Sequence, residues 1–169
     1  MARDPFERRR RREQRRVVAE WKTGCDEPTG LAIDTANARL FVGCRGREPV
    51  LAVLDTNDGR IVAKVEIGRG NDAVIYDDGK VFTANGVDGN LVIYRQQDAD
   101  HYVLEQAVTT RPYARTMAMD RSSKRLYLVT AEGVADPSRK INRGPAPFYP
   151  NDYYADTFAL LVYAPQATP

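Results

Sequence analysis

A repeat of about 43 residues is the feature that most restricts how this chain can fold. Three stretches each hold an apolar run, an aspartate, a polar turn and a second apolar run: "GLAIDTANARLFV" at 30–42, "AVIYDDGKVFT" at 73–83 and "TMAMDRSSKRLYLV" at 116–129. Their aspartates, Asp34, Asp77 and Asp120, are spaced 43 and 43 residues apart. Recurrence at this interval is typical of repeat folds with one supersecondary unit per repeat.

Each repeat predicts four short strands. The strand segments are rich in Val, Ile, Leu, Phe and Tyr, and polar turn residues separate them. In the first two repeats we expect strands at 30–34, 40–44, 51–55, 61–67, 73–77, 80–85, 90–95 and 102–108. Asp-Gly pairs in "DTNDGR" and "DDGK" favour hairpin turns, because Gly accepts positive φ. Four antiparallel strands at this interval predict an all-β fold of β-propeller blades, spanning residues 17–165.

The predicted blades are 30–67, 73–108 and 116–163. The last has strands at 116–120, 125–130 and 157–165, a long insertion at 131–156 and no fourth strand before the C-terminal tail at 166–169. Near the N-terminus, "VVAEWKTG" resembles "IVAKVEIG" at 61–68 with an offset of 44 residues. Residues 17–22 therefore predict an outer fourth strand of a preceding blade, which is the strand that the last blade lacks.

Three blades are too few to close a ring, because propellers normally use about four to eight. The sequence leaves three explanations open. The chain is the C-terminal part of a longer propeller, or two copies associate to give six blades, or three sheets form an open stack. The partners expected on this basis are further propeller blades or a second copy of the chain.

The charge of the chain is concentrated at its start. Residues 1–16 hold eight Arg and carry a net charge of +5, whereas the whole chain carries +2. We expect a disordered or helical tail there and no nucleic-acid contact beyond it, since the remaining chain is net acidic. The tail lacks the apolar core of a signal peptide, and no segment reaches the roughly 18 apolar residues of a membrane span. The compartment stays undetermined.

The blades resemble a known family. The segments "EPTGLAIDTANARLFVGC", "GRGNDAVIYDDGKVFTANGVDGNLVIY" and "RTMAMDRSSKRLYLVTAE" look like YVTN-repeat (YncE-like) β-propeller proteins, with "VFTAN" at 81–85 in place of Tyr-Val-Thr-Asn. The resemblance covers roughly residues 17–165 and is similar to the C-terminal part of such proteins. It implies a propeller, and usually export. Related propellers include binding proteins, lactonases and quinoprotein-type dehydrogenases, so the resemblance alone does not fix the function.

The function predicted from these observations is a non-enzymatic binding or scaffold module, without a cofactor or metal and without assigned catalytic residues. The alternative is a lactonase or quinoprotein-type enzyme whose catalytic residues lie partly in other blades. A polar ligand or peptide site is expected where the chain leads into each inner strand and leaves each second strand. The candidate residues are Glu27, Arg45, Arg69, Asp72, Asn85, Arg111, Arg115 and Glu132.

Other conspicuous residues receive structural interpretations. Asp34, Asp77 and Asp120 begin tight turns, where Asp accepts backbone N–H bonds. Cys25 and Cys44 are expected to be reduced thiols, although the predicted hairpin would bring both to one end and allow a disulfide. His101 falls in an outer hairpin turn. The aromatic residues of the insertion either cap a blade or take part in recognition; they are Phe148, Tyr149, Tyr153 and Tyr154.

Overall fold

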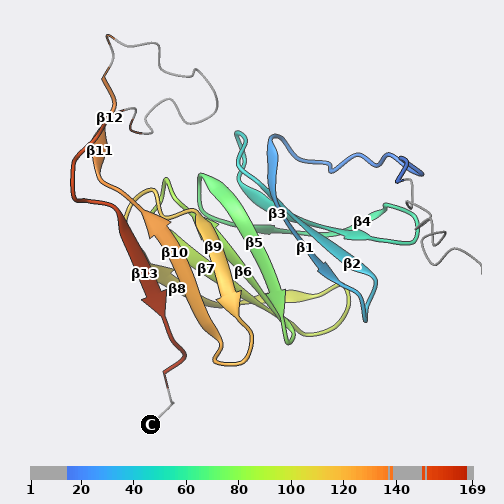
Figure 1. The fold of residues 1–169 in the computed structure, drawn as a ribbon. Coiled ribbons are helices and arrows are strands. Elements are labelled where there is room, and N and C mark those ends of the chain that lie inside the picture. The colour runs from blue at the N-terminus through green and yellow to red at the C-terminus, as the bar shows by residue number, and fades with distance from the viewer. Residues whose placement is uncertain (1–14, 137, 139–149, 151, 167–169) are drawn as a thin grey trace, which may run out of the picture.

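The chain folds into a stack of antiparallel β-sheets (Figure 1). The structure is a computed structural model that describes residues 15–136, 138, 150 and 152–166. These residues form strands and turns and contain no helix. The Arg-rich segment 1–14 and most of the insertion, Phe148 and Tyr149 included, lie outside the described residues, so expectations for those segments stay untested.

The first two sheets have four strands each, in chain order. The first contains β1 (Pro28–Asp34), β2 (Arg39–Cys44), β3 (Val50–Asp55) and β4 (Ile61–Glu66). The second contains β5 (Asn71–Asp77), β6 (Lys80–Asn85), β7 (Asn90–Gln96) and β8 (Tyr102–Thr109). These are propeller blades, and their strands follow the predicted ones within a few residues.

The third sheet has three strands in the described part of the chain, in the order β13-β10-β9. These strands are β9 (Thr116–Asp120), β10 (Arg125–Thr130) and β13 (Ala159–Tyr163). Two short strands not expected from the sequence, β11 (Gly133–Val134) and β12 (Asp152–Tyr153), pair at the base of the insertion. The architecture is an incomplete propeller, as predicted.

Apolar layers hold the blades together. One cluster between the first and second sheets includes Phe41, Leu51 and Val81, all fully buried. A second cluster, between the second and third sheets, includes Leu91 and Leu128. Side chains alternate between the two faces of each strand, so a central sheet must be apolar on both. This explains why the middle strands read as nearly continuous apolar runs.

The inner strands approach closely, and glycine makes this approach feasible. A Cβ at Gly43 would lie 2.0 Å from Asn71 Oδ1, and one at Gly30 would lie 2.6 Å from Val74 Cγ2. Any larger residue at these positions would collide with β5. The small residues noted in the sequence therefore mark the contact of neighbouring blades near the axis.

Residues 17–22 form no strand in the single chain, and the expectation that they supply the outer strand of another blade stays a prediction. Residues 15–23 run as irregular chain beside the first sheet, and the Trp21 ring lies against Gly59 in the β3–β4 turn. The third sheet lies at the other end of the stack (Figure 1). With only three blades between them, residues 17–22 cannot reach β13 of the same chain.

The three repeat aspartates sit at strand ends and serve the turns and the contacts between blades. Asp34 accepts hydrogen bonds from the backbone N–H groups of Ala36 and Asn37 at 3.0 and 3.3 Å. Asp120 likewise accepts from Ser122 at 3.0 Å. These three contacts agree with the interpretation of Asp34 and Asp120 as turn residues.

Asp77 binds the next blade through ion pairs, whereas Asp34 is linked to the next blade by a hydrogen bond that Gln96 Nε2 donates at 3.2 Å. It contacts Arg121 at 2.9 Å and Lys124 at 2.6 Å, both in the β9–β10 turn. The hydrogen bond from Lys124 holds the pKa of the Asp77 carboxyl below its ordinary value. Its main role is therefore an ionic link between the second and third sheets.

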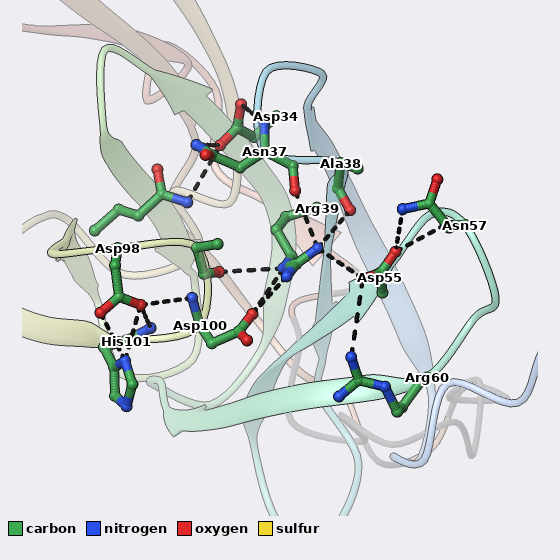
Figure 2. A network of polar contacts seen from close by, with 12 residues as sticks. Asp34, Asn37, Ala38, Arg39, Asp55, Asn57, Arg60, Asp98, Asp100 and His101 are labelled. Carbon is green, nitrogen blue, oxygen red and sulfur yellow. Dashed lines mark hydrogen bonds and ion pairs between the residues drawn. The ribbon is translucent and has the colours of Figure 1, made fainter.

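A buried arginine links the first two sheets at the same end (Figure 2). Arg39 contacts Asp55 at 2.9 Å and Asp100 at 2.7 Å, and its guanidinium also donates to backbone oxygens. His101 lies at the edge of this network, exposed, with Nδ1 2.8 Å from Asp98. The expected place of His101 in an outer turn agrees with the structure.

Within the residues that the structure describes, no helix is long and apolar enough to cross a membrane.

Candidate functional site

The candidate site lies at the end of the sheets opposite Arg39, where β1, β5 and β9 begin and β2, β6 and β10 end. The antiparallel register places these positions side by side, since Pro28 is opposite Cys44 and Asn71 is opposite Asn85. A bulge interrupts the pairing next to both positions. Bulges redirect side chains, and they are common beside functional sites.

Three charged residues from three blades meet here. Asp72 in β5 contacts Arg45, just after β2, with 2.5 Å between Nη1 and Oδ1. The other oxygen of Asp72 lies 2.9 Å from Nε of Arg115, just before β9. All three side chains are half-buried. One carboxylate between two guanidinium groups leaves this Arg45–Asp72–Arg115 cluster with a net charge of +1.

Repeated loop contacts hold the cluster in place. The N–H of Arg45 donates to the carbonyl of Glu27 at 3.1 Å, and the N–H of Gly86 makes the corresponding bond to Gly70 at 3.0 Å. A Cβ at Gly86 would lie 2.9 Å from Cβ of Arg115, so glycine leaves room for that arginine. The same backbone geometry in successive blades thus presents residues of successive repeats at one end.

One atom of the cluster lacks a partner. Nε of Arg45 is buried and has no hydrogen-bond partner among the described residues. A buried donor without a partner is costly, commonly by about 1 to 3 kcal/mol. An acceptor supplied by a ligand or by water would remove this cost.

The other predicted site residues do not join this cluster. Arg69 pairs with Asp88 at 2.7 Å, and Arg111 pairs with Glu132; both pairs are largely exposed. The side chain of Glu27 is exposed, and its backbone has a φ of 55°. Of the eight predicted residues, Arg45, Asp72 and Arg115 form one cluster, and Arg111 and Glu132 form a separate pair.

Asn85 has a structural role instead of a surface one. It is fully buried, and its Nδ2 donates to Asn90 Oδ1 at 2.9 Å and to the Thr83 carbonyl at 3.2 Å. Thr83 donates to the carbonyl of Val92 at 3.2 Å. The "VFTAN" segment therefore places its Thr and Asn in a buried hydrogen-bond network that ties β6 to β7.

Asn71 is an important residue that the sequence analysis missed. It is fully buried, and its amide donates to the Ala84 carbonyl at 3.2 Å and to Asn85 Oδ1 at 3.1 Å. Its Oδ1 has no partner among the described residues. The sequence did carry a signal. At the position where the other two repeats have Pro28 and Ala114, the second repeat has an asparagine.

Cys25 and Cys44 form a disulfide, contrary to the expectation of reduced thiols. Their Cα atoms are 6.1 Å apart, within the usual range for disulfides. Cys44 ends β2 and is fully buried, and Cys25 precedes β1. The bond fixes the loop that carries Glu27 beside Arg45.

Three acidic residues at this end, Asp72, Asp88 and Glu132, are paired with arginine. In the described part of the chain, no group of three or more His, Cys, Asp or Glu side chains is placed to hold a metal ion. Asp72 is shared by Arg45 and Arg115. Chemically, the cluster offers cationic donors around one fixed carboxylate.

Comparison with known proteins adds little to this picture. No family model matches the chain, and no curated protein matches it significantly. Among solved structures, a gluconolactonase from Xanthomonas campestris is similar at 19% identity with a TM-score of 0.45. The match covers 62% of this chain and 35% of that chain, so it spans about a third of the neighbour's length.

Proposed function

We propose that this chain is a non-enzymatic binding module of the YVTN-repeat (YncE-like) kind, and that its axial loop face binds an anionic group of a small ligand or a peptide carboxylate. The meeting of Arg45, Asp72 and Arg115 carries the proposal. Three separate repeats supply these side chains, so the site depends on the assembled stack.

The electrostatics of the cluster favour an anion. Two guanidinium groups and one carboxylate leave an excess positive charge, and half-burial reduces the screening of that charge by water. Guanidinium groups bind carboxylate and phosphate through paired, charge-assisted hydrogen bonds. Nε of Arg45 is buried without a partner among the described residues, so a ligand that displaced the atoms covering it would gain this donor.

Calorimetric titration with succinate and with inorganic phosphate tests the proposal. Arg45→Gln should weaken binding about tenfold, the equivalent of about 1.4 kcal/mol, because it removes the charge-assisted contact. Arg60→Gln, at the other end of the first sheet, is the matched control and should leave affinity unchanged. Equal affinity in Arg45→Gln and the unaltered chain would refute the site.

Asp72→Asn gives a second test with the opposite sign. It removes the carboxylate that competes with the ligand for both arginines, so anion affinity should rise. A loss of binding in this variant would show that Asp72 itself holds the ligand. Metal-dependent hydrolysis of a sugar lactone by the purified chain would overturn the non-enzymatic part of the proposal and favour the lactonase alternative.

A further inference from the structure

The third sheet has an open outer edge. β13 pairs with β10 on one side, and the described residues place no strand on its other side. Leu160 and Val162 of β13 are 60% and 53% exposed. A sheet edge with exposed apolar side chains is a template for another strand.

A pocket marks the vacant position. It measures about 570 Å³ and lies between the second and third sheets, beside β8 and the end of β13. Its lining includes Ile93, Gln106, Val108, Met119, Leu126 and Tyr163. An outer fourth strand in the third sheet would lie over this pocket, as β8 of the second sheet contributes Tyr102 to the core between the first and second sheets.

At the other end of the stack, the chain carries a segment whose sequence matches an outer fourth strand. Residues 17–22 align with Ile61–Glu66 of β4 at an offset of 44, yet they form no strand. Val17 and Val18 are both 85% exposed. The segment starts 11 residues before β1, and β4 starts 10 residues before β5, so the segment is placed to serve a sheet that would lie before the first one.

We infer that two copies of this chain close a six-bladed ring in which residues 17–22 of each copy form the fourth strand of the partner's third sheet. Six blades lie within the usual range of propellers. Each copy has two different end faces, the outer face of its first sheet and the outer face of its third sheet. The first sheet of each copy would pack on the third sheet of the other copy, and these two head-to-tail contacts close the assembly with twofold symmetry.

The repeat predicts the register of the added strand. In the first sheet, Val65 is opposite Leu51 and Ala63 is opposite Val53. The alignment transfers these pairs to Trp21 opposite Leu160 and to Ala19 opposite Val162 of the partner. Both exposed residues of β13 thereby gain apolar neighbours on the open face of the third sheet.

The end faces of the stack fit the same assembly. Leu31 and Ile33 of β1 are 63% and 52% exposed on the outer face of the first sheet. Val129 of β10 is exposed on the outer face of the third sheet. Head-to-tail association would bury these apolar residues against one another and remove the unfavourable exposure.

Sedimentation and light scattering of the full chain test the inference first. The expected mass is twice the 19.0 kDa of one chain, held constant over a wide range of concentration. A monomer at tens of micromolar would overturn the inference. An open-ended ladder of larger species would also overturn it, because it would show head-to-tail contacts that do not close.

A proline tests the strand itself. Ala19→Pro removes a backbone donor and prevents regular pairing, but residues 15–23 form no strand in the single chain, so each copy should keep its fold. We expect Ala19→Pro to sediment as a monomer with unchanged circular dichroism, and the control Ala19→Ser to remain a dimer. A dimeric Ala19→Pro would refute strand exchange.

Cysteine cross-linking tests the register. Directly opposed residues in antiparallel strands lie about 4.5 to 5.5 Å apart between Cα atoms, which suits a disulfide. The segment before β1 and strand β13 lie at opposite ends of the stack (Figure 1), so a chain carrying Ala19→Cys and Val162→Cys should oxidise to a covalent dimer. The control pair Glu20→Cys and Val162→Cys points to opposite faces and should remain uncross-linked; equal cross-linking of both pairs would overturn the register.

Trp21 supplies a spectroscopic signal because it is the single tryptophan of the chain. It is 39% exposed in one copy, and pairing beside Leu160 would bury it further. Dilution of the dimer should therefore shift its emission to longer wavelength, and Leu160→Asp should give the shifted spectrum at all concentrations. Emission independent of concentration in a sample shown to dissociate would contradict the placement of Trp21.

Discussion

Lys124 in the β9–β10 turn reaches back to the second sheet and lies 2.6 Å from the carboxylate of Asp77. Arg121 contacts the other oxygen of that carboxylate at 2.9 Å. One aspartate of the repeat thereby connects two successive blades at the end away from the Arg45–Asp72–Arg115 cluster.

The Asp77 link predicts a loss of stability in acid. Hydrogen bonding from Lys124 lowers the pKa of Asp77 in the folded state below its ordinary 3.8. The stabilisation is therefore complete above about pH 5 and is lost as the pH falls below 3.8 toward the folded-state pKa. Asp77→Asn should cost about 1 kcal/mol at pH 7, since both cations are partly exposed.

Urea denaturation at pH 7 and pH 3 measures this effect. The difference in unfolding free energy between the variant and the unaltered chain should shrink at pH 3, which is below the ordinary pKa of 3.8, because the unfolded chain then binds a proton at this aspartate. Asp78→Asn, at the next position in the same turn, is the control. An equal cost of Asp77→Asn at both pH values would show that the ion pairs do not stabilise the fold.

Arg39 predicts a larger effect because it is buried between two acidic residues. Arg39→Met should destabilise the chain by about 3 kcal/mol, since it leaves Asp55 and Asp100 without their shared cation. Arg60→Met is the matched control: Arg60 is exposed and lies 3.9 Å from the same Asp55, so its removal should cost under about 0.5 kcal/mol. Thermal and chemical denaturation should rank the two variants in this order; equal costs would contradict the burial argument.

Gly43 predicts a steric cost near the axis. Gly43→Ala would place a Cβ 2.0 Å from Asn71 Oδ1, so the asparagine or the strand must shift. We expect a loss of about 1 to 3 kcal/mol, the usual range for overpacking. A double-mutant cycle with Asn71→Ala should show coupling, because Asn71→Ala removes the nearest clash and leaves only Val74 Cγ2 at 2.7 Å to shift; additive effects would contradict a direct clash with Asn71.

The disulfide predicts a measurable response to reductant. The unfolded chain exposed to a thiol reagent should show no free thiols before reduction and two afterwards, from Cys25 and Cys44. Reduction should lower the unfolding free energy by about 3 kcal/mol, as expected for a loop of this length. The control Cys25→Ser with Cys44→Ala should have stability independent of reductant. Two free thiols before reduction would contradict the bond.

The sequence predicted the blades well because their signals are local. The 43-residue period, the Asp-Gly turns and the apolar strands belong to single hairpins, and the strands at 40–44 and 80–85 lie within a residue of their predicted limits. The site was predicted only in part, since the repeat could align Asp72 and Arg115 without showing that one carboxylate would also bind Arg45.

The sequence by itself therefore determined an all-β repeat fold, its hairpins and the end at which polar residues gather. Only the tertiary structure decided which charges pair, that Asn71 is buried, that Cys25 meets Cys44, and that residues 17–22 stay outside any sheet of their own chain. The physical reason is that strand formation depends on neighbours in sequence, whereas pairing across blades depends on how many sheets stack and how closely their inner strands approach.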